Sequence, residues 1–214
     1  MDTFLDKLQH SLTQPLPGEK AYGKMLRAPR PSVAEVIKSG KNPRKSAVLL
    51  LLYPKQNQLH TVLTLRPGYK GVHSGQVSFP GGKMEPNDAD EIATALREAN
   101  EEVNVDPRSV NVIGKLSQLY IPPSNFIVDP IVGYSPEIPD FQPEEREVEQ
   151  IILAPVQRIM EKDVIRSTTI HLEQYNTSIE AKYFDIADQI VWGATAMILA
   201  EFRDIIQPFW RQGL

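Results

Sequence analysis

The chain has 214 residues, of which 41% are hydrophobic and 23% charged, and these fractions are ordinary for one globular domain with a sizeable core. Its net charge of −4 argues against a protein that binds nucleic acid or an acidic membrane through its overall charge. The chain contains no cysteine, which excludes disulfides, zinc–thiolate sites and thiol nucleophiles.

Neither the histidines nor the apolar runs indicate a histidine metal site or a membrane span. The four histidines include no HxxxH or HxH pair. The longest apolar run, AVLLLLY at 47–53, is too short to cross a bilayer, and no signal-peptide core opens the chain. We therefore expect a cytoplasmic protein that acts on a small molecule and binds neither nucleic acid nor membrane.

Residues 1–44 are expected to form a short helix and an irregular arm. The stretch TFLDKLQHSL at 3–12 carries Phe4, Leu8 and Leu12 on one side and predicts an amphipathic helix. From Pro15 to Pro43 the chain is rich in proline and basic residues, which predicts an irregular arm wrapped on the domain. The sequence leaves a homodimer open, although packing of the arm on its own domain is the simpler expectation.

The remaining chain alternates predicted strands with two substantial helices. SAVLLLLYP (46–54) and LHTVLTLR (59–66) read as a hairpin closed by KQNQ, and a glycine-bearing loop fills 68–90. A helix is predicted from Ala89 to Val103, with Asn104 suited to a left-handed C-cap. Strands are predicted at 110–120, 126–134 and 163–175, a strand leading into a short helix at 148–156, and a closing helix at 191–206. This order favours a mixed α/β layered domain.

The helix at 95–105 places three glutamates on one side. At about 100° per residue, Glu98, Glu101 and Glu102 fall within roughly 100° of one another. Such like charges destabilise a helix by a few tenths of a kcal/mol each, whereas Mg²⁺ binds carboxylate oxygens. A solvated acidic face is the alternative for ExxEE taken alone. The apolar stripe, about 140° away by the same geometry, consists of Ile92, Leu96, Ala99 and Val103.

The sequence around these glutamates, GGKMEPNDADEIATALREANEEVNV at 81–105, resembles the Nudix box G-x5-E-x7-R-E-U-x-E-E-x-G-U, with U aliphatic. There are fourteen residues between Gly82 and Arg97, one more than in the general pattern. Asp88 stands where the first glutamate would be, and Asn104 replaces the last glycine. The resemblance implies a Nudix α/β/α sandwich with a mixed central sheet over 1–214 and the box at 82–105. The direct matches are Gly82, Arg97, Glu98, Glu101, Glu102 and Val105.

The residues before the box are similar to those of the coenzyme A pyrophosphatases, whose signature is LLT-x-R-S-x3-R-x3-G-x3-F-P-G-G. Here VLTLRPGYKGVHSGQVSFPGG at 62–82 has Val62, Pro67 and Gly71 at three signature positions, and Lys70 lies beside the missing arginine. PPSNFIVDPIVGY and IVWGATAMIL also resemble later segments of that subgroup, so the similarity runs from about residue 46 to 202. The residues kept from the signature are Leu63, Thr64, Arg66, Gly75, Phe79, Pro80, Gly81 and Gly82.

This resemblance implies hydrolysis of the coenzyme A diphosphate, dependent on Mg²⁺ or Mn²⁺, to adenosine 3′,5′-bisphosphate and 4′-phosphopantetheine. One alternative is a Nudix hydrolase of another nucleoside diphosphate linked to a group X, such as ADP-ribose, a dinucleotide or a nucleotide sugar. Another is a Nudix-fold ligand-binding module without turnover. The intact box glutamates argue against the module.

The resemblance also implies roles for the box residues. The metal ligands would be Glu98, Glu102, Glu101 and the carbonyl of Gly82. Arg97 is expected to orient a carboxylate by pairing with Glu101, with phosphate binding as the alternative.

The remaining site residues are drawn from the loops. The general base would be Glu101 or a glutamate of PEEREVEQ at 143–150, with Glu147 first among them. Trp192 and Phe202 on the closing helix are expected to be core residues. The residues expected to meet substrate phosphates are Arg66, Lys70, His73 and Gly81.

Overall fold

The computed structural model describes residues 2–26, 30–68, 75–172 and 176–210. In these ranges the strands form an eight-stranded sheet and a three-stranded sheet. The predicted hairpin is confirmed, because β1 (Arg44–Lys55) pairs antiparallel with β2 (Gln58–Leu65). Gln56 and Asn57 turn the chain with φ values of 51° and 59°. Two consecutive positive values are typical of the tight turn whose twist matches that of the flanking strands.

Strand β1 lies at the centre of the large sheet, which is mixed. It runs parallel to β7 (Phe126–Tyr134) on one side. On the other side, β4 (Gly81–Lys83) pairs with its first half and β2 with its second half, both antiparallel. The other strands are β3 (Val77–Ser78) and β8 (Gln150–Pro155) on β2, and β5 (Asn111–Lys115) and β6 (Leu119–Ile121) on β7.

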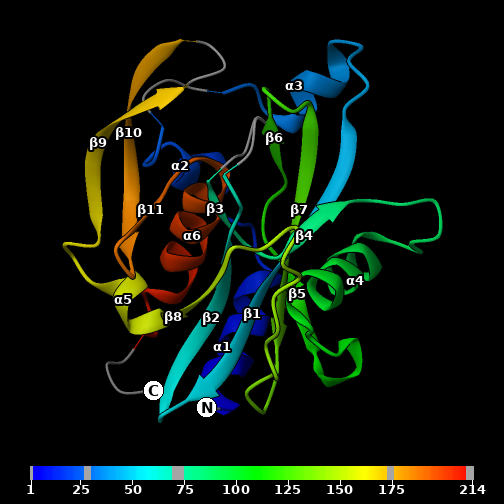
Figure 1. Ribbon diagram of the computed structural model, residues 1–214, viewed down its shortest axis with the longest axis vertical. Coiled ribbons are helices and arrows are strands. Elements are labelled where there is room, and N and C mark those ends of the chain that lie inside the picture. Colours follow the sequence, from blue (N-terminus) through cyan, green and yellow to red (C-terminus); the bar gives the residue numbers. More distant parts are fainter. Residues whose placement is uncertain (1, 27–29, 69–74, 173–175, 211–214) are drawn as a thin grey trace.

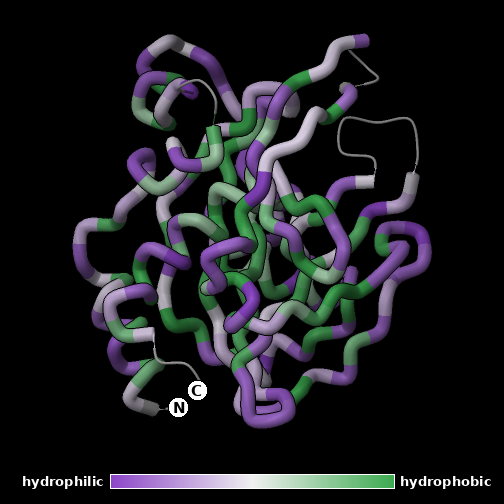
Figure 2. The backbone as a smooth tube through the Cα atoms, turned by 90° about the vertical axis from the view of Figure 1, so that its left-hand side faces the viewer, coloured by the Kyte–Doolittle hydropathy of each residue, from purple (hydrophilic) through white to green (hydrophobic). Residues whose placement is uncertain are grey.

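The large sheet is covered on both faces, so β1 is apolar on both. Leu49 and Leu51 pack toward α4 (Glu91–Val103), whereas Leu50 and Leu52 join the opposite core with α6 (Gly193–Ile206). Figure 1 shows the sheet between these two helices, and Figure 2 shows hydrophobic segments along the middle of the molecule. This arrangement confirms the predicted mixed sandwich.

The arm differs from its prediction. Helix α1 (Asp2–Leu12) is confirmed, but the stretch from Pro15 to Pro43 is not wholly irregular, because it contains α2 (Glu19–Tyr22) and α3 (Val33–Lys38). A capping box explains α3: the Ser32 hydroxyl accepts from the Glu35 amide, and the Glu35 carboxylate accepts from the Ser32 amide.

Several predicted boundaries are also wrong. Helix α4 begins at Glu91 instead of Ala89, because the Asp90 side chain caps it. The loop at 68–90 contains β3 and β4, and the segment at 110–120 is divided between β5 and β6. Strands β3 and β4 pair with β2 and β1, so local periodicity gave no signal for them. Strands β5 and β6 pair with different parts of β7, which divides the predicted strand. A 3-10 turn (Pro107–Ser109) follows α4.

The small sheet was predicted only in part. Strand β9 (Ile165–Leu172) lies within the strand predicted at 163–175, but β10 (Thr177–Ile186) and β11 (Gln189–Val191) had no predicted counterpart. Because β11 includes Val191, α6 begins at Gly193, two residues later than predicted. Helix α5 (Val156–Met160) follows β8 as expected. No helix in the described ranges is long and apolar enough to cross a membrane.

Candidate active site

Helix α4 carries the acidic cluster, and the structure corrects the position of one member. Glu98 and Glu101 have side chains 14% and 58% exposed, but the side chain of Glu102 is only 2% exposed. Glu102 therefore lies inside the domain, so the three glutamates do not form the solvated acidic face that was the alternative interpretation. Asn104 ends the helix with φ 59°, which confirms the predicted left-handed C-cap.

Gly81 and Gly82 allow the backbone to pass between β1 and the carboxylate of Glu98. Gly81 has φ +155°, and a Cβ there would lie 2.6 Å from the Cα of Val48. A Cβ on Gly82 would overlap the carboxylate of Glu98. Only glycine leaves room for both approaches, so these two residues form a cradle beside the carboxylate.

Glu102 is held beneath this corner by two donors. Its Oε2 accepts from the amide of Gly81 at 3.0 Å, and its Oε1 accepts from Nη2 of Arg66 at 3.2 Å. The same Nη2 lies 3.4 Å from the carbonyl oxygen of Gly81. The pKa of Glu102 is raised to about 7, mainly by burial and also by the charges of Glu98 and Glu147, although Arg66 and the Gly81 amide oppose the shift. The positive charge near Glu102 therefore does not offset the cost of burying its carboxylate.

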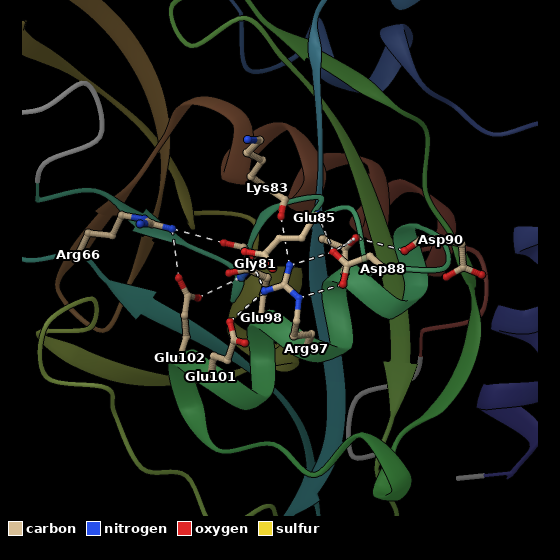
Figure 3. A network of polar contacts seen from close by, with 11 residues as sticks. Arg66, Gly81, Lys83, Glu85, Asp88, Asp90, Arg97, Glu98, Glu101 and Glu102 are labelled. Carbon is tan, nitrogen blue, oxygen red and sulfur yellow. Dashed lines mark hydrogen bonds and ion pairs between the residues drawn. The ribbon is translucent and has the colours of Figure 1, made fainter.

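Arg97 links the loop before α4 to two of the three glutamates (Figure 3). Nε and Nη2 bind Asp88 in a bidentate pair, each at 2.9 Å, and Nη2 also donates to the carbonyl of Lys83 at 3.2 Å. Nη1 donates to Glu98 at 3.0 Å and to Glu101 at 2.9 Å, so the expected pair with Glu101 is present. These bonds use all five N–H donors of a guanidinium. Arg97 has none left for a phosphate, which favours the orienting role.

The two carboxylates nearest Arg97 differ in pKa for physical reasons. Hydrogen bonds from Arg97 hold the pKa of Asp88 well below its usual range, helped by the Glu85 amide. Burial raises the pKa of Glu98 although Arg97 opposes the shift. Asp88 is thus a permanently charged anchor, whereas Glu98 gains from additional positive charge.

The donor set fits a hard divalent cation. As they stand, no three acidic or histidine side chains of the described residues converge on one point, because Arg97 and Arg66 hold the glutamates separately. The available donors are all oxygens, namely the three carboxylates and the carbonyl of Gly82, and such sets suit Mg²⁺ or Mn²⁺. The under-neutralised Glu102 and the open cradle at Gly82 both agree with such an ion.

Glu147 lies in a loop tied to this cluster. The amide of Glu144 donates to the carbonyl of Glu102 at 2.9 Å, and the amide of Glu149 donates to that of Leu65 at 2.9 Å. The exposed side chain of Glu147 contributes to the raised pKa of both Glu98 and Glu102, after burial as the main cause. Its carboxylate is therefore close enough to act on both.

A cavity of about 390 Å³ adjoins the glycine corner. Arg66, Gly82 and Lys83 line it beside the carboxylates, and Phe126 and Trp192 belong to a largely apolar wall. A site of this size accommodates a nucleotide-like ligand.

The structure thus brings together most of the predicted site residues. Lys70 and His73 lie outside the described residues. Phe202 is buried as predicted, but Trp192 is only partly buried and lines the cavity, so its assignment to the core was wrong. Arg30, Lys83 and Ser124 also line the cavity and were not predicted as site residues. Lys83 is a variable position of the box, whereas Arg30 and Ser124 come from distant segments without a local motif.

Comparisons with known proteins agree with this geometry. A sequence model described as the NUDIX domain matches residues 43–171. Nudix hydrolase NudL, an uncharacterized protein of Yersinia pestis (strain Pestoides F), is 36% identical over 156 residues, which cover 73% of this chain and 76% of the relative. NudL of Yersinia pseudotuberculosis serotype O:1b (strain IP 31758) matches to the same extent.

Two solved structures share the fold at low sequence identity. The Nudix hydrolase RenU from M. Smegmatis aligns with a TM-score of 0.55 and 13% identity, over 80% of this chain and 91% of that chain. A MutT/nudix family protein from Enterococcus faecalis aligns with a TM-score of 0.53 and 15% identity, over 88% and 73%. The extent of the sequence matches settles the family: this chain belongs to the Nudix hydrolases and is a pyrophosphohydrolase.

Proposed function

We propose that this enzyme hydrolyses the diphosphate bond of coenzyme A or its acyl derivatives, giving adenosine 3′,5′-bisphosphate and 4′-phosphopantetheine. The observation that carries this proposal is the composition of the cavity beside the carboxylates. The signature residues Arg66, Phe79 and Gly81 line it, and its lining combines the cationic groups of Arg30, Arg66 and Lys83 with a larger apolar surface. Such a surface suits a substrate with a charged diphosphate between a base and a less polar arm.

Nudix hydrolases generally need divalent cations, and here Glu98, Glu101, Glu102 and the Gly82 carbonyl would hold Mg²⁺ or Mn²⁺. When bound, the ion would neutralise the diphosphate oxygens and favour deprotonation of the attacking water. Arg97 would position Glu98 and Glu101, to which it is bonded at 3.0 and 2.9 Å. The absence of a side chain at Gly82 leaves room for the carboxylate of Glu98 beside the backbone.

A carboxylate would accept the proton of the attacking water. One candidate is Glu147, the first among the loop glutamates, because its charge contributes to the raised pKa of both Glu98 and Glu102. Glu101 is the other, with a side chain 58% exposed beside the same cluster. A base must reach the water at hydrogen-bond distance, and both residues border the cluster where the diphosphate would lie.

Arg66 and Lys83 would bind the substrate phosphates. Arg66 uses Nη2 for Glu102 and Gly81, its Nε and Nη1 make no hydrogen bond to the described residues, and the residue lines the cavity. A guanidinium suits phosphate oxygens through paired N–H donors. Lys70 and His73 stay predictions for the same role.

The test is product analysis of the purified enzyme with Mg²⁺ or Mn²⁺, offering coenzyme A, ADP-ribose and NADH separately. Release of 4′-phosphopantetheine at the highest kcat/KM would support the proposal. Preferential cleavage of ADP-ribose or NADH would discard coenzyme A while keeping the hydrolase chemistry. The Glu98→Gln variant, prepared in parallel, controls for a contaminating hydrolase.

A further inference from the structure

Arg30 lies in the wall shared by two cavities. One is the substrate cavity beside Gly82, and the other, of about 350 Å³, lies between the arm and β6 with Tyr22 and Tyr120 in its lining. Within the described chain, the hydrogen bond that Arg30 makes goes to the sulfur of Met197 at 3.7 Å. Thioether sulfur is a weak acceptor, so the guanidinium keeps most of its donor capacity for a ligand.

No acidic residue in the described ranges forms an ion pair with Arg30. Burial lowers the pKa of its guanidinium, and no neighbouring carboxylate opposes the shift. The group nevertheless stays protonated at neutral pH, because the pKa of arginine is far above that range. A partly buried cation without a counter-charge is unfavourable in the free protein, and a bound anion would relieve this.

Arm residues before and after Arg30 in the sequence are fixed to the rest of the domain. Before it, the Tyr22 hydroxyl lies 3.0 Å from a carboxylate oxygen of Glu201, which ties the arm to α6. After it, α3 begins at the Ser32 capping box, and Val36 packs on Tyr120 and Ile127 of the large sheet. The position of Arg30 against Met197 is therefore anchored by the fold.

A second polar group without a partner among the described residues belongs to a residue in the wall of the substrate cavity. The hydroxyl oxygen of Ser124 is buried and has no hydrogen-bond partner among the described residues, and Ser124 lines the same cavity as Arg30. Buried hydroxyls are normally hydrogen-bonded. A guanidinium and a hydroxyl in one cavity provide donors suited to the oxygens of a phosphate group.

We propose that Arg30 binds a phosphate monoester of the substrate that is separate from the scissile diphosphate. The inference rests on the proposed function, which places the diphosphate at Gly82, and it makes Arg30 a specificity-determining residue. In coenzyme A, this group is the 3′-phosphate of the adenosine. The remote phosphate is then recognised by the arm, whereas the box residues serve the reacting diphosphate.

The experiment compares coenzyme A with 3′-dephospho-coenzyme A for the wild type, Arg30→Met, Arg30→Lys and Lys24→Met. Met keeps the length of the stem without the charge, and Lys24 is an arm cation outside both cavities. We expect Arg30→Met to lower kcat/KM for coenzyme A about 10- to 100-fold, mainly through KM, and to leave the dephospho substrate unaffected. Arg30→Lys should recover part of the loss, and Lys24→Met should behave as the wild type. Equal losses on both substrates, or none, would overturn the proposal.

A binding measurement separates this inference from the proposed function. Calorimetry without metal compares adenosine 3′,5′-bisphosphate with AMP, which lacks the 3′-phosphate. Tighter binding of the bisphosphate by the wild type, lost in Arg30→Met, supports the role of Arg30 even if coenzyme A is not cleaved. Equal affinity of the wild type for the two nucleotides, or binding of neither, overturns it. Thermal unfolding of each variant establishes that it is folded.

Discussion

Arg97 and Asp88 form a bidentate ion pair that fixes α4 to the loop before it, with both N···O distances at 2.9 Å. Asp88 occupies the position at which the Nudix box has its first glutamate. Its carboxylate also accepts from the Thr94 hydroxyl and the Glu85 amide. Asp88 thus points Arg97 toward Glu98 and Glu101, which makes the pair a positioning device for the cluster.

Replacing Arg97 by Lys should reduce kcat without unfolding the enzyme. Lysine keeps a positive charge but cannot reproduce the fork that bonds Asp88, Glu98 and Glu101 together. Misplaced catalytic groups can lower a rate by about 100-fold, and we expect a loss of that order in kcat with KM nearly unchanged. Steady-state kinetics of Arg97→Lys and Asp88→Asn would measure it. A rise in KM with normal kcat would instead indicate that Arg97 binds substrate.

The Asp88 pair should also appear in the pH dependence of stability. Arg97 depresses the pKa of Asp88 in the folded state. The contribution of Asp88 to the free energy of unfolding is therefore full above its unfolded pKa of about 3.9 and is lost as the pH falls toward the folded pKa. Between about pH 5 and pH 3, the unfolding free energy of Asp88→Asn should therefore fall less than that of the wild type. Urea denaturation across this range would show it. Parallel curves would contradict the depressed pKa.

The sequence predicted those parts of the site that one local segment specifies. Helix α4, its Asn104 cap and the Arg97–Glu101 pair follow from periodicity and spacing within the box. The burial of Glu102 does not, because it depends on where Gly81 approaches β1. Strands β10 and β11 were missed although Ile179, Ala181 and Tyr183 alternate with charged residues in β10; the first four residues of β10 are exposed, and β11 has only three residues.

The residues that line the cavity could not be predicted from local sequence patterns either. Arg30 and Trp192 come from the arm and from the residue before α6, and they share a cavity only in the folded chain. A basic, proline-rich arm gave no reason to single out Arg30 from its neighbours.

Divalent cations should stabilise the wild type through the buried carboxylates. A ligand at 100 times its Kd adds about 2.7 kcal/mol to the unfolding free energy. Glu98→Gln and Glu102→Gln should lose most of the increase in Tm with Mn²⁺ and about 100-fold or more in activity. Glu145→Gln, in an exposed position of the neighbouring loop, is the control. An undiminished increase in Tm for both box variants would contradict their assignment as ligands.

Substitution of Gly81 should mainly reduce stability, whereas substitution of Gly82 should mainly reduce activity. A Cβ at Gly82 meets the mobile end of Glu98, so Gly82→Ala should change stability by less than about 1 kcal/mol but displace that carboxylate and abolish most activity. A Cβ at Gly81 meets the backbone of Ala47 and Val48, so Gly81→Ala should destabilise by at least about 2 kcal/mol. Urea melts and kcat measure the two effects. Gly68→Ala, where a Cβ meets nothing within 4 Å, is the matched control. Full activity of Gly82→Ala would show that the cradle is not needed.

Glu201 on α6 should be the main anchor of the arm. It is fully buried, and its Oε1 accepts from the amide of Gly18 at 2.8 Å and the hydroxyl of Ser117 at 2.6 Å. Its Oε2 accepts from the amide of Ser117 at 3.0 Å and lies 3.0 Å from the Tyr22 hydroxyl. Burial, together with Glu201, raises the pKa of Tyr22, so its hydroxyl remains a donor. Three donors thus converge on one carboxylate, and the Tyr22 hydroxyl is shared between this carboxylate and the Ser117 carbonyl.

Glu201→Leu should therefore reduce the unfolding free energy by about 2 to 4 kcal/mol, because it leaves buried amides without an acceptor. Tyr22→Phe removes one donor and should lower it by about 1 kcal/mol. Urea denaturation would rank the two variants. If the arm positions Arg30, Tyr22→Phe should also weaken the preference for adenosine 3′,5′-bisphosphate over AMP while leaving Mn²⁺ stabilisation intact. Loss of the metal effect together with the preference would mean that the arm supports the whole site and not only the remote phosphate.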